Sequence, residues 1–225
     1  MATKQQVPVI AARLVEFQEE FSNLSTEDAQ WAIINGKEAA ALSAKAIANY
    51  MKAKNEARAV LLSNVIYTFS VPATTEKFVV KDNFKVDISK MAKVKISYLS
   101  VDFQRWFSAK VEHPFAGSKI LGRKLENNSI DGPIIYELGG QEKAEITLAE
   151  IYAMMTDQFN GKNGCLLNNE WANIFYVNDV NGTLRTVFVA WVNGGWRVGA
   201  SSIEDHYKWM AYRLVFARDF QELRS

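Results

Sequence analysis

Residues 172–198, ANIFYVNDVNGTLRTVFVAWVNGGWRV, contain three runs of aromatic and β-branched residues separated by two turn signals. The Asn-Gly pairs at 181–182 and 193–194 are strong hairpin signals, because a type I′ turn needs positive φ at both central residues. The stretch therefore predicts a three-stranded antiparallel meander. Its middle run alternates in two mostly apolar sets, so we expect both faces of this strand to be covered. The sets are Val187, Val189 and Trp191 on one face, and Thr186, Phe188, Ala190 and Val192 on the other.

Local signals predict the elements on either side of this meander. Before it, in chain order, we expect a strand over 60–71 that Pro72 ends, a hairpin over 77–88 that turns at Asp82-Asn83, a strand over 93–101, a short helix over 101–111 that Ser100 caps, and an irregular loop over 113–133. A hairpin turning at Gly139-Gly140 and a helix over 148–159 with a Thr147–Glu150 capping box follow. After the meander, the run 208–220 is an amphipathic helix or, by preference, a strand through 212–217.

The first 58 residues have a helical pattern. One helix is expected to begin at Pro8, and a second follows a cap at Ser25 or Thr26, with a break at Asn35-Gly36. Two helices alone cannot bury both apolar stripes, so they must pack on the rest of the chain or on a partner. The composition changes near residue 60. We therefore predict an α+β fold: a helical arm or hairpin over 1–58 packed on a mainly antiparallel domain over 59–225, or one domain overall.

Composition places limits on the class of protein. The chain of 225 residues has enough apolar residues to bury a core without disulfides or a structural metal. Its single cysteine, Cys165, excludes an intramolecular disulfide and favours a reducing compartment. No stretch approaches the roughly 18 consecutive apolar residues of a transmembrane helix, and the N-terminus lacks the apolar region of a signal peptide. We expect a cytoplasmic protein without a membrane partner.

Charge is unevenly distributed along the chain. Residues 35–125 contain 16 basic and 7 acidic residues, whereas 126–225 contain 8 basic and 13 acidic residues. Solvated faces that differ by chance explain this distribution most simply. Two sharper explanations are electrostatic complementarity between subunits and a basic face for a polyanion.

Residues that commonly carry catalysis are scarce. His113 precedes a proline and is typical of a turn residue, and Cys165 has no local setting for an activated thiolate. Glu204, Asp205 and His206 could bind a cation or form a catalytic group only if a loop or helix turn gathered them. A surface acid cluster is the simpler interpretation. One cysteine and two distant histidines do not supply a zinc site, so no metal and no cofactor are expected.

Four tryptophans, at 171, 191, 196 and 209, gather late in the sequence. Exposed tryptophans on a sheet can stack on sugars or bases, but alternation favours burial for most of this set. Trp196, at a hairpin exit beside Arg197, is the one that we expect to be exposed.

Three functions remain, in order of preference. The first is a non-catalytic structural or protein-interaction protein, a subunit of a homo-oligomer or larger assembly, whose contacts are Ile10, Leu14, Phe17, Phe21, Trp196 and Arg197. The second is a nucleic-acid-binding module that uses the basic region 35–125 through Lys93, Lys95, Arg105, Lys110, Arg123 and Lys124. The third is a small enzyme that uses His206 with Asp205 or Glu204.

Overall fold

The computed structural model describes residues 25–56 and 60–219, and the side chains of 47–56 are not described. Contacts between Cα atoms divide the chain into two units at the boundary between Arg58 and Ala59. This boundary lies where the composition of the sequence changes. Independent folding of the two units, and packing of one on the other, stay predictions. The expected helix from Pro8 lies outside the described residues.

The described part of the first unit is helical, as the sequence predicted. Helix α2 spans Thr26–Ile34 and is capped by Ser25, whose hydroxyl accepts a hydrogen bond from the Asp28 N–H. Helix α3 spans Gly36–Glu56. Asn35 separates the two helices, because its backbone leaves the helical region there (φ −104°, ψ 39°). The predicted break is confirmed.

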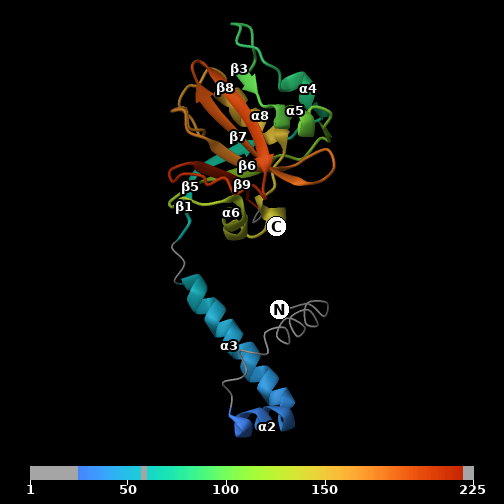
Figure 1. Ribbon diagram of the computed structural model, residues 1–225. Helices are drawn as coiled ribbons and strands as arrows, with labels where there is room; N and C mark the ends of the chain where they lie inside the picture. Colours follow the sequence, from blue (N-terminus) through green and yellow to red (C-terminus); the bar gives the residue numbers. More distant parts are fainter. Residues whose placement is uncertain (1–24, 57–59, 220–225) are drawn as a thin grey trace. The chain divides into compact units, whose positions relative to one another are not determined.

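Within residues 60–219, seven strands form one sheet in the order β1-β5-β9-β6-β7-β8-β3 (Figure 1). Most neighbours are antiparallel, but β9 is parallel to β6 and β3 is parallel to β8. The predicted α+β class with a mainly antiparallel sheet is confirmed. The strands are β1 (Leu62–Val71), β3 (Ile96–Leu99), β5 (Ser118–Leu125), β6 (Asn173–Asn178), β7 (Leu184–Val192), β8 (Gly195–Ser202) and β9 (Leu214–Arg218); the short β2 (Phe78–Val79) and β4 (Val111–Glu112) pair separately.

The C-terminal meander has the predicted order β6-β7-β8 and antiparallel pairing. At the second hairpin, Asn193 and Gly194 have φ values of 50° and 83°, the positive values that a type I′ turn requires. The final strand β9 confirms the preference for a strand over a helix in this run.

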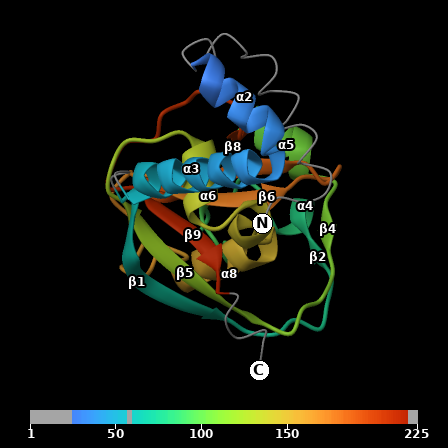
Figure 2. The same ribbon diagram turned by 90° about the horizontal axis from the view of Figure 1, so that it is seen from below.

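One face of the sheet is covered by helices α5 (Val101–Phe107) and α8 (Leu148–Asp157). Ser100 caps α5, and Thr147 and Glu150 form the expected capping box of α8. Strands β1 and β5 curve past α8 (Figure 2). We call this side the helix-covered face; its buried sheet residues include Phe175, Val187, Val189, Trp196 and Val198.

The opposite face is covered along only part of its width. Helices α6 (Asp131–Glu137) and α7 (Gln141–Ala144) pack there on β1, β5, β6 and β9. The remaining part, over β7, β8 and β3, we call the open face. Phe188, Ala190 and Val192 lie on it and are only partly buried. The expectation that both faces of β7 are covered therefore holds for only part of the strand, where Leu184 and Thr186 are buried.

Two expected hairpins are wrong. Residues 80–83 form the one-turn helix α4 (Val80–Asn83), and β2 pairs with β4 instead of with the next run of the chain. Gly139 and Gly140, with φ of 99° and 103°, join α6 to α7. Positive φ at glycine ends a helix as well as it turns a hairpin, so the dipeptide alone did not discriminate between the two.

The expected loop over 113–133 is also wrong, because β5 lies within it and pairs with both β1 and β9. Three basic residues and a glycine hid the strand, since these types are depleted in strands or uninformative. Gly122 is needed for close packing: a Cβ at this position would lie 2.7 Å from a ring carbon of Phe216.

Candidate functional site

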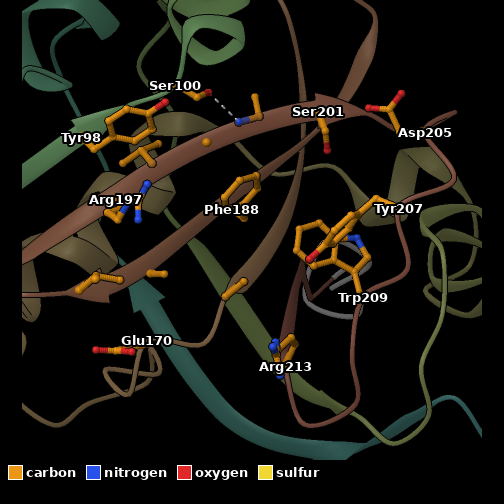
Figure 3. Close-up of a pocket in the computed structure, with 16 residues that line it drawn as sticks. Tyr98, Ser100, Glu170, Phe188, Arg197, Ser201, Asp205, Tyr207, Trp209 and Arg213 are labelled. Atoms are coloured by element: carbon orange, nitrogen blue, oxygen red, sulfur yellow. Dashed lines mark hydrogen bonds between the residues drawn. The ribbon is translucent and has the colours of Figure 1, made fainter.

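The open face contains a pocket of about 620 Å³, within the size range of small-molecule sites. Figure 3 shows Phe188 in its middle, with Tyr98 and Arg197 on one side and Tyr207 and Trp209 on the other. Strands β7 and β8 supply the floor, and β3 and the segments 170–172 and 205–213 supply the walls. The lining includes Tyr98, Ser100, Glu170, Ala172, Phe188, Ala190, Val192, Arg197, Gly199, Ser201, Asp205, Tyr207, Trp209 and Arg213.

An aromatic ring forms the centre of the floor. Phe188 of β7 pairs directly with Gly199 of β8. A Cβ at position 199 would lie 2.2 Å from the tip of the Phe188 ring, so only glycine lets this ring lie across β8. The result is a flat apolar surface at the bottom of the pocket.

A buried carboxyl positions one wall. Trp209 donates its Nε1–H to Asp131 Oδ1 at 2.8 Å, and the hydroxyl of Tyr176 donates to the same oxygen at 2.9 Å. Burial raises the pKa of Asp131, although these two hydrogen bonds act in the opposite direction. Trp209 then contacts Phe188 and Tyr207 edge-on, with ring centroids 5.6 and 4.9 Å apart. The indole is thus fixed from behind and presented to the pocket.

Two arginines of the pocket lack an acidic partner. The guanidinium of Arg197 lies over the Tyr98 ring at 5.0 Å, and that of Arg213 lies over the Trp171 ring at 4.5 Å. Among the described residues, no carboxylate oxygen lies within 4.0 Å of either guanidinium. Stacking on a ring holds a guanidinium in place while its N–H edge can still donate. Arg213 already donates one Nη1 hydrogen bond to the Ala211 carbonyl at 3.3 Å, which leaves its other N–H groups for a ligand.

Three other arginines of the same unit are ion-paired. Arg105 pairs with Asp102, Arg185 with Asp179 and Arg218 with Glu150, at 3.0, 3.0 and 2.7 Å. The two guanidinium groups at the pocket therefore differ from these three in lacking a carboxylate. An anionic group of a ligand would supply one.

The trio Glu204, Asp205 and His206 does not converge. Asp205 lines the pocket, but its Oδ2 accepts the Ser202 N–H. Glu204 and His206 are exposed and do not line this pocket. In the described ranges, no group of three His, Cys, Asp or Glu side chains could hold a metal ion.

The six basic residues proposed for nucleic acid do not form one free surface. Lys93 and Lys95 precede β3 at one edge of the sheet, whereas Arg123 and Lys124 lie on β5, five strand positions away, or roughly 24 Å. Four of the six already have partners: Arg105 with Asp102, Lys110 with Glu112 and the Asn178 carbonyl, Arg123 with the Ser63 carbonyl, and Lys124 with Glu126.

Of the residues proposed for partner binding, Ile10, Leu14, Phe17 and Phe21 lie outside the described residues. Trp196 is fully buried, so its expected exposure is wrong. Its side chain points to the helix-covered face, donates to the Gln158 carbonyl at 3.3 Å and packs on Trp191. Arg197, the next residue on the strand, points to the other side and is exposed in the pocket.

Two buried acidic residues stabilise the fold through contacts that the sequence did not predict. Glu150 is fully buried and pairs with Arg218 through two hydrogen bonds of 3.0 and 2.7 Å. Burial would raise the pKa of Glu150, but Arg218 and the Ser118 hydroxyl outweigh it and lower this pKa. Glu112 accepts the Leu148 and Ala149 N–H groups at the start of α8.

The single thiol, that of Cys165, is buried. Cys165 packs in the core under α8, and burial raises its pKa to about 11.

Comparison of the chain with protein-family models, with curated proteins and with solved structures gave no match. The functional argument therefore rests on the geometry of the site.

Proposed function

We propose that this protein is a non-catalytic binding protein whose pocket on the open face holds a ligand with a flat apolar body and an anionic group. One observation carries the proposal: two guanidinium groups without a carboxylate partner among the described residues line one aromatic pocket. A carboxylate, phosphate or sulfonate can accept two parallel N–H bonds from one such group. A flat ring system can pack on Phe188, with Tyr98 and Tyr207 at its edges.

Two other polar residues of the pocket, Ser100 and Asp205, are engaged in local structure. Ser100 Oγ accepts the Phe103 and Ala200 N–H groups, at 3.1 and 3.2 Å, so its lone pairs are engaged in local structure. Asp205 is engaged with the Ser202 backbone. A nucleophile needs an adjacent base within hydrogen-bonding distance, and these contacts give neither residue that role.

A fluorescent aromatic anion tests the proposal. The full chain is titrated with anilinonaphthalene sulfonate, whose emission rises in apolar surroundings, and with N-phenylnaphthylamine, which has the same rings without the sulfonate. We expect saturable binding of the sulfonate at least about tenfold tighter than binding of the neutral compound, because a hydrogen bond to a charged group contributes about 1.5–3 kcal/mol. Equal affinity for the two probes would contradict an anion site.

Arginine variants test whether the probe binds in this pocket. Arg197→Gln and Arg213→Gln should each weaken sulfonate binding about tenfold and leave the neutral probe unaffected. The matched control is Arg105→Gln, which removes the same charge from α5, where Arg105 pairs with Asp102. Near-ultraviolet circular dichroism checks that each variant is folded. Binding that survives in both pocket variants would place the probe elsewhere.

The helical unit supports a second candidate function, self-assembly. Trp31, Ile33, Ile34 and Leu42 of α2 and α3 are exposed, and exposed apolar side chains gathered on short helices favour a surface that a partner covers. Light scattering on a size-exclusion column should then give a discrete mass above that of one chain. Leu14→Asp with Phe17→Asp should reduce this mass without unfolding the sheet. A monomeric wild type would exclude self-assembly but not the pocket.

A further inference from the structure

The segment between α4 and β3 forms an ordered loop that projects from the domain, at the top of Figure 1. We call residues 85–95 the projecting loop. Its base is closed by two backbone hydrogen bonds between Asp87 and Ile96, of 2.9 and 3.0 Å. Phe84, directly before the loop, and Val94, near its end, are buried in the core. The loop is thus anchored at both ends.

A turn holds the tip of the projecting loop. The Ser89 N–H donates to the Asp87 carboxylate at 2.9 Å, and the Ala92 N–H donates to the Ser89 carbonyl at 3.2 Å. Lys90 and Met91 occupy the two central positions of this turn. The tip therefore has a defined shape that directs these two side chains away from the fold.

Apolar side chains on the projecting loop have large exposed fractions. Met91 is 92% exposed, Ile88 63% and Val86 61%. Single exposed apolar residues are ordinary on protein surfaces, but three within six residues on one ordered projection form a local apolar tip.

Lysines surround this tip. Lys81, Lys85, Lys90 and Lys93 are exposed. No carboxylate of the described residues lies within 4.0 Å of any of these four ammonium groups. Residues 81–93 also contain two exposed acidic residues, Asp82 and Asp87, so the lysines leave an excess of two positive charges around the apolar tip.

The chemistry of this tip fits an anionic lipid surface better than other polyanions. Nucleic-acid surfaces without sequence preference use aromatic side chains that stack on bases, and Val86, Ile88 and Met91 are all aliphatic. A convex tip also offers little of the broad area, about 800 Å² per partner, that a stable protein interface buries. A bilayer accepts a convex apolar tip between its headgroups and attracts the surrounding lysines.

We propose that the projecting loop docks this protein on an anionic lipid bilayer, with Ile88 and Met91 entering the headgroup boundary and the lysines contacting acidic headgroups. This proposal departs from the expectation of no membrane partner, which depended on the lack of a segment long and apolar enough to span a membrane. In the described residues, likewise, no helix could cross a membrane. Attachment to a surface needs no spanning segment.

Vesicle sedimentation with the full chain tests the proposal. One set of vesicles contains only phosphatidylcholine, and the other contains about three parts phosphatidylcholine to one part phosphatidylserine. We expect the protein to sediment with the second set at low ionic strength and to be released by salt. Lys85→Gln with Lys90→Gln should lower the partition coefficient about 25-fold, because each lysine near the surface contributes about fivefold. Ile88→Ser with Met91→Ser should lower it as well.

Matched control variants test whether the projecting loop is the part of the protein that contacts the vesicles. Lys162→Gln with Lys208→Gln removes the same charge from other exposed positions, and Val101→Ser removes an exposed apolar side chain from α5. Both controls should sediment like the wild type. Absence of sedimentation with phosphatidylserine vesicles would overturn the proposal. So would equal losses in loop and control variants, or binding of the loop to single-stranded RNA in the absence of any binding to vesicles.

Discussion

The two faces of the sheet use the same strands in different ways. On the helix-covered face, β7 and β8 contribute Val187, Val189 and Trp196 to a core that α5 and α8 complete. On the open face, the residues between them, Phe188 and Arg197 among others, line a pocket. Because side chains alternate along a strand, one run of sequence serves both purposes. The buried side chains of the helix-covered face hold β7 and β8 in place, and these strands in turn position the side chains that line the pocket on the open face.

This comparison predicts unequal stability effects at neighbouring positions. Trp196→Ala should lower the free energy of unfolding by about 4 kcal/mol, because it removes a fully buried ring from the helix-covered face. Phe188→Ala should cost only about 1 kcal/mol, because this ring is half-buried on the open face. Urea denaturation monitored by circular dichroism measures both. Similar losses for the two variants would show that the open face is also part of the core.

The helix-covered face also depends on a buried ion pair. Glu150→Gln should cost about 3 kcal/mol, because it leaves the partly buried Arg218 without its charged partner. The pKa of Glu150 is lowered in the fold, so its ion pair stabilises the protein above the ordinary value of 4.5 and loses that contribution as the pH falls further. Urea denaturation at a series of pH values should therefore show a flatter acid limb for the variant. Parallel pH profiles would contradict this role of Glu150.

A substitution in the floor of the pocket should have a smaller effect on the free energy of unfolding. Gly199→Ala places a methyl group where the Phe188 ring lies, so the ring must move into the pocket. We expect a loss of about 1 kcal/mol in unfolding free energy, because a half-buried ring can move away at moderate cost. The same variant should weaken binding of anilinonaphthalene sulfonate. Gly182→Ala is the control for steric contact, because a methyl group at this turn position meets no neighbouring atom. It does not control for backbone strain, because Gly182 has a positive φ that alanine adopts only with strain. Unchanged probe binding in Gly199→Ala would mean that Phe188 is not the floor of the binding site.

The smallest effect concerns the carboxyl behind Trp209, which responds to pH in the opposite sense to Glu150. Burial raises the pKa of Asp131, so its ionisation opposes folding as the pH rises above the ordinary value of 3.8. Asp131→Asn keeps an oxygen acceptor for Trp209 and Tyr176 but cannot ionise. The variant should therefore gain stability relative to the wild type as the pH rises from acid to neutral. A relative loss of stability over the same range would show that the ionised carboxylate is the stabilising form.

The sequence was informative where structure is local. The Asn193-Gly194 turn, the Ser100 cap and the Thr147–Glu150 capping box each depend on a few neighbouring residues, and all three were predicted. At the first hairpin, only Gly182 of the Asn181-Gly182 pair has a positive φ, so the expected type I′ turn is wrong there although the hairpin itself forms. Alternation also placed Phe188 with Ala190 on one face. Arg197 was predicted to be exposed together with Trp196. Arg197 is exposed, whereas Trp196 is fully buried.

The parts of the fold and of the pocket that were not predicted depend on contacts between segments that are distant in the sequence. Strand β5 is stable because β1 and β9 pair with it, and neither partner is close in sequence. Which part of the second face stays open depends on where α6 and α7 pack, and residues 131–144 carry no local signal of that position. Tyr98 reaches the pocket from β3, and Arg213 from the segment that precedes β9. A pattern within one segment could not predict that they would meet.

The most direct test of the pocket compares methyl groups on the two faces of one strand. In protein with labelled alanine and valine methyl groups, nuclear magnetic resonance follows Ala190 and Val192 on the open face and Val187 and Val189 on the helix-covered face during titration with anilinonaphthalene sulfonate. We predict that the Ala190 and Val192 signals shift with saturation, and that those of Val187 and Val189 do not. Shifts confined to Val187 and Val189, or shifts of all four that persist in Arg197→Gln and Arg213→Gln, would contradict an anion-binding pocket on the open face.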